Sequence, residues 1–209
     1  MSKITTYGAA GKVTTGFSKP YVAIYGNSSG TVSYSSGQVL ARGVSVSLDI
    51  QTAEDNNFYA DNVTAESANG RFTGGNAAVT VDGLLPLAEK LIMGLADPEE
   101  LTMSGTDKAD IYYYGDGNTI PYMGFAYVRR WMCDGVTGYN AEILTKVKFA
   151  ASGNDAATQE EDISWQTKAL TATLHRDDSD KHRWRRFSED YTTEAEAEAV
   201  IKKLFGITA

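Results

Sequence analysis

The chain of 209 residues is long enough to bury one sizeable hydrophobic core and too short for two large domains. Its hydrophobic residues (42%) and charged residues (22%) occur at the frequencies of globular proteins, which excludes a disordered polymer. The formal net charge of -8 at pH 7 argues against a generic nucleic-acid binder, because contacts with phosphates need a surplus of Lys and Arg.

The single cysteine, Cys133, rules out an intramolecular disulfide, so packing and hydrogen bonds must hold the fold. This is typical of proteins that mature in a reducing cytosol. Residues 1–17 lack the apolar run of a secretion signal, and no segment approaches the ~20 consecutive apolar residues of a membrane span. We therefore expect a protein that is neither exported by a cleaved signal nor embedded in a membrane.

The first 18 residues contain several glycines and threonines with only scattered apolar residues. Such a composition is typical of an arm that lacks a fold of its own. We therefore expect a flexible N-terminal arm at residues 1–18 and a single domain at residues 19–209.

The strongest signal for secondary structure lies between Val44 and Gln51, where apolar and polar residues alternate. A period of two is typical of a strand with one buried face and one wet face. The apolar face would hold Val44, Val46, Leu48 and Ile50. The polar face would hold Ser45, Ser47, Asp49 and Gln51.

Further runs rich in β-branched and aromatic residues, separated by Gly, Asn and Asp turns, predict additional strands. They lie at residues 21–25, 31–34, 58–60, 77–81, 109–114, 122–131, 139–149, 163–166, 170–174 and 183–187. Helical spacing predicts one amphipathic helix from Leu84 to Leu95. A capping box at Thr193 and Glu196 predicts a C-terminal helix that ends near Gly206. The fold class is therefore mainly β, a β-sandwich or barrel with one flanking helix and a short C-terminal helix.

Residues suited to catalysis are sparse. The two histidines, His175 and His182, fall in one charged hairpin, and Cys133 is best interpreted as a small hydrophobe at the end of a buried strand. The glycines at residues 74–75 lack the Lys-Ser/Thr ending of a phosphate loop. We therefore expect no enzyme activity and no cofactor.

The best candidate for a metal site has the spacing of a calcium loop, with Asp178 first and Glu189 twelfth. Its fifth residue is His182, a poor calcium ligand, and its sixth is Arg183, where the loop needs glycine and a cation opposes the ion. Together with Asp180, the segment is better interpreted as an Asp-rich turn without a metal. The bases and aromatic residues of this hairpin resemble a nucleic-acid strip, but the acids around them favour a charge-paired surface or a subunit contact.

Aromatic residues suggest a different class of protein, because the rings of a β-sandwich can form a carbohydrate-binding face. The candidates on two predicted strands are Tyr112, Tyr114, Tyr122, Tyr127 and Trp131. Aromatic residues are also common in strands, where they fill cores and interfaces. Both interpretations stay open at this point.

Four stretches, in their order along the chain, resemble a known family. They are residues 19–25 (Lys-Pro-Tyr-Val-Ala-Ile-Tyr), 58–62 (Phe-Tyr-Ala-Asp-Asn) with 72–75 (Phe-Thr-Gly-Gly), 121–127 (Pro-Tyr-Met-Gly-Phe-Ala-Tyr), and 146–149 (Lys-Val-Lys-Phe) before 163–167 (Ile-Ser-Trp-Gln-Thr). On these motifs the chain resembles the major tail proteins, or tail tube proteins, of long-tailed non-contractile phages (siphophages) of Gram-positive bacteria. The resemblance extends from Lys19 to the final helix.

This resemblance implies a structural virion protein that forms hexameric rings, which stack into the tail tube through which DNA passes. The implied partners are further copies of the chain and the tape measure, distal tail and tail terminator proteins. The implied location is the host cytoplasm during assembly and the virion afterwards. Because such proteins stack through long loops and arms, we expect inter-subunit contacts at Phe58, Tyr59, Asp61, Asn62 and Phe72.

The residues agree with this function in three ways. The face formed by Ser45, Ser47, Asp49 and Gln51 would suit a water-filled lumen, and an acidic protein would repel phosphates so that DNA passes without specific binding. Ring closure would also pair sheet edges that otherwise invite aggregation. Two alternatives remain: a carbohydrate-binding β-sandwich module, and the tube protein of a contractile tail or tail-like bacteriocin.

Overall fold

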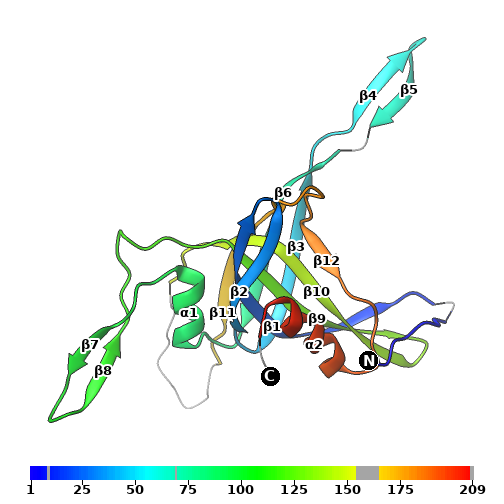
Figure 1. Ribbon diagram of the computed structural model, residues 1–209. Coiled ribbons are helices and arrows are strands. Elements are labelled where there is room, and N and C mark those ends of the chain that lie inside the picture. Colours follow the sequence, from blue (N-terminus) through cyan, green and yellow to red (C-terminus); the bar gives the residue numbers. More distant parts are fainter. Residues whose placement is uncertain (9, 69, 154–164, 208–209) are drawn as a thin grey trace.

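The computed structural model describes residues 1–8, 10–68, 70–153 and 165–207 (Figure 1). The strands in this part are β1 (Val13–Ser28), β2 (Thr31–Val39), β3 (Gly43–Thr52), β4 (Asn56–Ala60), β5 (Val63–Ala68), β6 (Phe72–Val81), β7 (Glu99–Thr102), β8 (Lys108–Ile111), β9 (Met123–Cys133), β10 (Val136–Phe149), β11 (Lys168–His175) and β12 (Arg185–Phe187). The helices are α1 (Pro86–Met93) and α2 (Glu194–Leu204). The fold is mainly β, as the sequence predicts.

One antiparallel sheet, in the order β2-β1-β9-β10-β11-β6-β3, forms the body of the protein. β12 pairs with β10 at residues 142–144, just before the stretch of β10 that pairs with β11. The sheet curls, so that β1 and β3 contact each other. Just after β2, the backbone N–H of Leu40 donates to the carbonyl of Pro20 in β1 at 2.9 Å. Within the described residues, the outer edges of β2 and β3 pair with no further strand.

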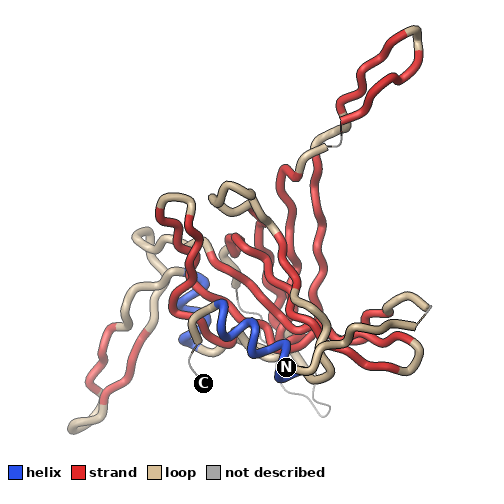
Figure 2. Tube along the Cα trace, turned by 45° about the vertical axis from the view of Figure 1, so that its right-hand side comes forward, coloured by secondary structure: helices blue, strands red, loops and turns tan. Residues whose placement is uncertain are grey.

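Each face of the sheet carries a hydrophobic core. The larger core lies inside the curve, where α1 packs against the sheet, and it includes Val79, Ile92, Phe125, Phe149 and Leu174. The smaller core lies between α2 and the outer face of β1, β9 and β10, and it includes Ala126, Ile143, Ile201 and Phe205. Figure 2 shows both helices lying against the strands. The outer face of β11, β6 and β3 has no such cover among the described residues.

Tight turns join three pairs of strands. The two central residues of each turn have positive φ: Ser29 and Gly30, Asp61 and Asn62, and Asp134 and Gly135. Such turns match the right-handed twist of the strands that they connect, and Gly, Asn and Asp tolerate this backbone best. The Asp134-Gly135 turn between β9 and β10 is an example of the Asp and Gly turns that the sequence predicts between strands. The β4–β5 and β7–β8 hairpins project from the body in different directions (Figures 1 and 2).

Several strands differ from their predicted limits. β1 begins at Val13, because residues 13–18 pair with β9, so the boundary expected after residue 18 falls inside a strand. The sequence does not predict β5 or β7, since one is short and polar and the other holds two glutamates among four residues. The strand predicted at residues 109–114 ends at Ile111. Of the strand predicted at residues 163–166, the first two residues lie outside the described part, and the last two are not in a strand.

Both predicted helices are present. α1 lies inside its predicted limits, with Pro86 in the first turn. α2 follows Thr193, but the Thr193 side chain caps no backbone N–H. Its hydroxyl donates to the Glu196 carboxylate at 3.0 Å, and the same carboxylate accepts the backbone N–H of Ser2. The predicted capping-box hydrogen bonds are therefore wrong, because these donors occupy the Glu196 carboxylate.

Candidate assembly surfaces

The predicted wet face of β3 is exposed. Its residues are Ser45, Ser47, Asp49 and Gln51. The side chains that pack on the larger core from the other face are Val46, Leu48 and Ile50. Val44 departs from the predicted pattern with 53% exposure, because the pairing of β3 with β6 shifts register between Gly43 and Ser45. The alternation therefore holds from Ser45 onwards.

This wet face continues across the neighbouring strands. The register places Asp49 beside Asn76 of β6, Asn76 beside Thr173 of β11, and Thr173 beside Lys148 of β10. Adjacent rows add small or hydroxyl side chains at Ala78, Thr80, Ala169 and Thr171. We call the exposed outer side of β3, β6, β11 and the end of β10 the hydrophilic face. Asp49 lies near one side of this face and Lys148 near the other. Their backbones are about 14 Å apart at the usual strand spacing.

Four of the five predicted contact residues belong to the β4–β5 hairpin. Asp61 and Asn62 form its exposed turn, which lies at the far end of the hairpin from the sheet (Figure 1). The side chains of Phe58 and Tyr59 lie outside the described part of the structure. Phe72, the fifth residue, stacks on Trp184 of its own chain, with ring centroids 4.8 Å apart. The structure therefore brings Asp61 and Asn62 to the hairpin tip and holds Phe72 at its base.

The N-terminal segment binds the domain through Asp190. The Asp190 carboxylate accepts hydrogen bonds from the Tyr7 hydroxyl at 2.6 Å, from the Trp131 indole N–H at 2.7 Å, and from the Lys12 ammonium. The backbone N–H of Ile4 also donates to the Asp190 carbonyl at 2.8 Å. Burial would raise the pKa of the Asp190 carboxyl, but the hydrogen bonds from Lys12, Tyr7 and Trp131 outweigh this and hold the pKa below its usual range. Sequence patterns give no signal for this cluster, because Lys12 and Asp190 are 178 residues apart.

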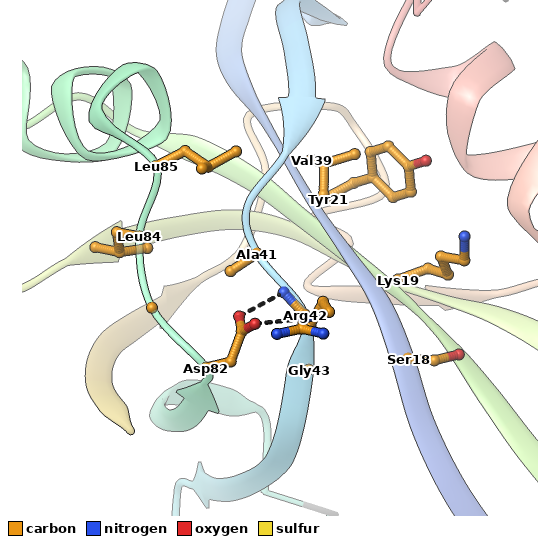
Figure 3. Close-up of a pocket in the computed structure, with 11 residues that line it drawn as sticks. Ser18, Lys19, Tyr21, Val39, Ala41, Arg42, Gly43, Asp82, Leu84 and Leu85 are labelled. Carbon is orange, nitrogen blue, oxygen red and sulfur yellow. Dashed lines mark hydrogen bonds and ion pairs between the residues drawn. The ribbon is translucent and has the colours of Figure 1, made fainter. Parts of the chain in front are cut away.

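A groove opens between β1 and the chain that links β2 to β3 (Figure 3). Its volume is about 650 Å³, and most of its lining is apolar. Leu84 and Leu85 form one side, and Lys19 lies on the other. The Arg42 backbone N–H donates to one Asp82 oxygen at 2.9 Å and its side-chain Nε donates to the other, which holds the pKa of the Asp82 carboxyl below its usual range. The sequence does not single out this groove.

The predicted sugar-binding aromatic residues do not form one platform. Tyr127 is buried in the larger core, and Trp131 is buried against the N-terminal segment. Tyr114 donates its hydroxyl to Glu89 at 2.7 Å. The ring of Tyr122 lies against the ammonium groups of Lys146 and Lys148 and not against the other candidate aromatic rings. Tyr112 is partly buried against the edge of the larger core, so the five residues do not share one exposed surface.

Two acids of the segment with calcium-loop spacing pair with cations of the chain. Asp178 accepts a hydrogen bond from Lys146 at 2.7 Å, and Glu189 pairs with Lys3. Among the residues that the structure describes, no group of three or more His, Cys, Asp or Glu side chains is placed to hold a metal ion. Cys133 is buried, and its thiol donates to the Ala10 carbonyl at 3.1 Å.

His175, the other sequence candidate for catalysis, lies at the end of β11. Its ring meets the ring of Tyr122 edge-on, with centroids 5.3 Å apart. Burial, together with the charges of Lys146 and Lys148, lowers the pKa of His175 below its usual range. The ring is therefore neutral at pH 7 and belongs to an aromatic and cationic cluster.

No helix in the described part of the chain combines the length and apolar character needed to cross a membrane. Comparison of the chain with known protein families and with curated proteins gave no match.

Proposed function

We propose that this chain is a structural subunit whose copies form hexameric rings, and that stacked rings form the tail tube of a long-tailed phage. The observation that carries the proposal is the hydrophilic face, which runs over four strands of a sheet whose other face covers the larger core. Its side chains are short and rich in hydroxyl groups. A sheet wet on one side and dry on the other suits the wall of a water-filled channel.

The ends of the sheet support ring formation. β2 and β3 lie at opposite ends of the strand order, and each leaves one row of backbone N–H and C=O groups without a strand partner in the described residues. Such edges invite pairing with another chain. If β3 of one subunit pairs with β2 of the next, the repeated contact closes into a ring and no edge remains open.

The projecting β4–β5 hairpin supports stacking of rings. Its turn at Asp61 and Asn62 is exposed and lies far from the sheet (Figure 1). A hairpin of this kind cannot bury an apolar face by itself, so a contact with the next ring would give it a structural purpose. Phe72 then serves as an anchor at the hairpin base through its stacking on Trp184.

The charge of the chain supports passage of DNA without binding. A subunit with a net charge of -8 repels phosphates in general, and β3 contributes Asp49 and no base to the hydrophilic face. Lys148 is the exception on this face. The proposed function needs no cofactor. The further partners expected from the resemblance are the tape measure, distal tail and tail terminator proteins.

The alternative of a carbohydrate-binding module has weaker support, because Tyr127 and Trp131 are buried and cannot stack on a sugar. One experiment on the full chain distinguishes the two functions. Size-exclusion chromatography with light scattering and negative-stain microscopy should show rings or tubes. A monomer that is retained on a glycan column would overturn the proposal.

A hairpin deletion refines this test. In β3–β6 pairing Thr52 lies opposite Phe72, so an Asn-Gly turn can join these two residues in place of the β4–β5 hairpin. We expect this variant to form rings that no longer stack into tubes. Normal tubes from the variant would show that the hairpin is not the stacking contact.

A further inference from the structure

We infer that the β7–β8 hairpin of one copy docks in the groove of a second copy, with its apolar face on the groove and Glu99 of that face beside the basic groove rim. This inference rests on the proposed function, because the contact would join neighbouring subunits within a ring. It assigns a partner surface to two features that face solvent in the single chain.

The β7–β8 hairpin has two unlike faces. Its register sets Leu101 opposite Ala109 and Glu99 opposite Ile111. Residues opposite each other or two apart in a strand share a face, so Leu101, Ala109 and Ile111 lie together, with Glu99 at the end of the same face. Leu101 and Ile111 are 49% and 46% exposed. The residues of the other face are Glu100, Thr102, Lys108 and Asp110.

This apolar face has no cover within the described part of its own chain. β7 and β8 pair with each other alone, and every residue of β7 is exposed. Figures 1 and 2 show the hairpin projecting from the body beyond α1. A two-stranded hairpin in water is marginally stable, and burial of its apolar face against a partner would stabilise it.

The groove offers a matching apolar surface. Val39 and Leu85 line it and are 44% and 63% exposed. These side chains come from two separate parts of the chain that the fold brings together. A volume of about 650 Å³ also leaves room for inserted side chains.

Charge favours the hairpin as the occupant. The segment from residue 97 to residue 110 contains one lysine and five acids: Asp97, Glu99, Glu100, Asp107 and Asp110. The groove rim carries Lys19, whose ammonium lies 3.7 Å from the Glu198 carboxylate, and Arg42, whose side chain is 90% exposed although its Nε is bonded to Asp82. Opposite charges at the edges of an apolar contact fix its orientation and speed its formation.

The geometry of the contact agrees with a ring. The hairpin and the groove are different surfaces of the same chain, so docking joins unlike surfaces head to tail. A contact of this kind repeats from copy to copy and closes when the rotation between copies is suitable. A contact between like surfaces would instead stop at a dimer.

Two single-cysteine additions test the direction of the contact. Leu101→Cys places a thiol on the apolar face of the hairpin, and Leu85→Cys places one at the groove; native Cys133 is buried in both. We expect mild oxidation of a mixture of the two full-length variants to give disulfide-linked dimers at least tenfold more than either variant alone. The matched control is a mixture of the Leu101→Cys variant with a Thr171→Cys variant, whose thiol is exposed on the hydrophilic face. This mixture should not cross-link.

The outcomes separate docking from the proposed function. Rings or tubes without a Leu101→Cys to Leu85→Cys link would overturn the docking and leave the tail function standing. A specific link in oligomers that are never rings would support the docking and overturn the tail function. Dimers from Leu101→Cys alone would show hairpin-to-hairpin contact and overturn the head-to-tail arrangement.

A second variant tests the apolar contact without cysteine. Leu101→Asp adds a charge at an exposed position, so the melting temperature of the monomer should stay the same. We expect the midpoint concentration of assembly to rise at least tenfold. Leu101→Met, which keeps the apolar side chain, should assemble normally, and equal assembly of the Asp and Met variants would overturn the docking.

Discussion

The sheet has two unlike halves. In the half formed by β1, β9 and β10, both faces are covered, and β9 holds six consecutive buried residues from Met123 to Val128. In the half formed by β11, β6 and β3, one face is covered, and buried residues alternate with more exposed ones along β11. The difference arises from α2, which lies over the first half and leaves the second half wet.

This contrast separates stability from the proposed function. The doubly covered half packs against the buried side chains of the smaller core. It also contains a buried carboxylate, Glu142, which pairs with Arg129 and Arg185. The singly covered half presents short polar side chains that make no core contacts. Substitutions on the outer face of the sheet should therefore be costly in the first half and nearly silent for folding in the second.

The largest effect is expected for Phe205→Ala. Phe205 is fully buried, and its ring lies 5.0 Å from that of Tyr34. Its loss should lower the free energy of unfolding by about 3 to 5 kcal/mol, the range for aromatic truncation in a core. Thr171→Ala on the hydrophilic face should change it by at most ~0.5 kcal/mol. Denaturant titrations of both variants measure the difference, and similar losses would contradict the division into halves.

A smaller effect is expected for Glu142→Gln. Glu142 is 1% exposed and accepts hydrogen bonds from Arg185 at 2.9 and 3.1 Å, with Arg129 at 3.2 Å. Loss of one partner of a fully buried ion pair costs about 3 to 5 kcal/mol. Both arginines are about one-third exposed and can gain water, so we expect about 2 kcal/mol. Asp49→Asn is the exposed control, and a loss as small as that of the control would contradict the role of Glu142.

The singly covered half of the fold was largely predictable from the sequence. Val46, Leu48 and Ile50 alternate with polar residues because one face of the strand is buried and the other is exposed to water. Helix α1 was equally visible through its spacing and Pro86. β5 and β7 could not be predicted, because projecting hairpins bury little and therefore need no apolar pattern.

The candidate surfaces were predictable only in part. The polar side of β3 was found from local periodicity, but Lys148 joins it through the register of three further strands, which no local pattern contains. The groove likewise depends on the curl that brings Arg42 near β1. Tyr7 and Lys12 reach Asp190 across almost the whole chain. Each of these features is a product of tertiary packing rather than of sequence order.

The next effect concerns the N-terminal segment, which binds the covered half through Asp190. Because the folded-state pKa of Asp190 lies below its usual range, its carboxylate contributes stability above the unfolded pKa of about 3.9, and this is lost as pH falls through the lower folded pKa. Asp190→Asn should therefore cost about 1 to 2 kcal/mol at pH 7. Once the pH lies below the folded pKa, wild type and variant should be equally stable.

Unfolding free energies at several pH values measure this difference, and hydrogen exchange of Ile4 reports release of the segment. Asp49→Asn, exposed on the hydrophilic face, is the control and should show no such pH dependence. A constant difference between wild type and Asp190→Asn from pH 7 to pH 2 would mean that the charge of Asp190 does not hold the segment.

The smallest effect on folding and the clearest effect on function are expected for the double variant Ser47→Lys and Asp49→Lys. Both side chains are exposed on the hydrophilic face, so stability should change by at most ~0.5 kcal/mol per site. If this face lines the tube, each added lysine repeats in every subunit of every ring and meets DNA phosphates. Each phosphate contact adds a salt-dependent attraction.

We therefore expect tubes of normal appearance that eject DNA more slowly, with partial rescue at raised salt, because screening shortens the reach of the added charges. Ejection kinetics from virions that carry both lysines measure the effect, and Ser47→Ala with Asp49→Asn is the uncharged control. Normal ejection would remove this face from the lumen. A double variant that fails to fold would show instead that the wet half of the sheet is covered in the assembled protein or during folding, and the contrast between the two halves would then disappear.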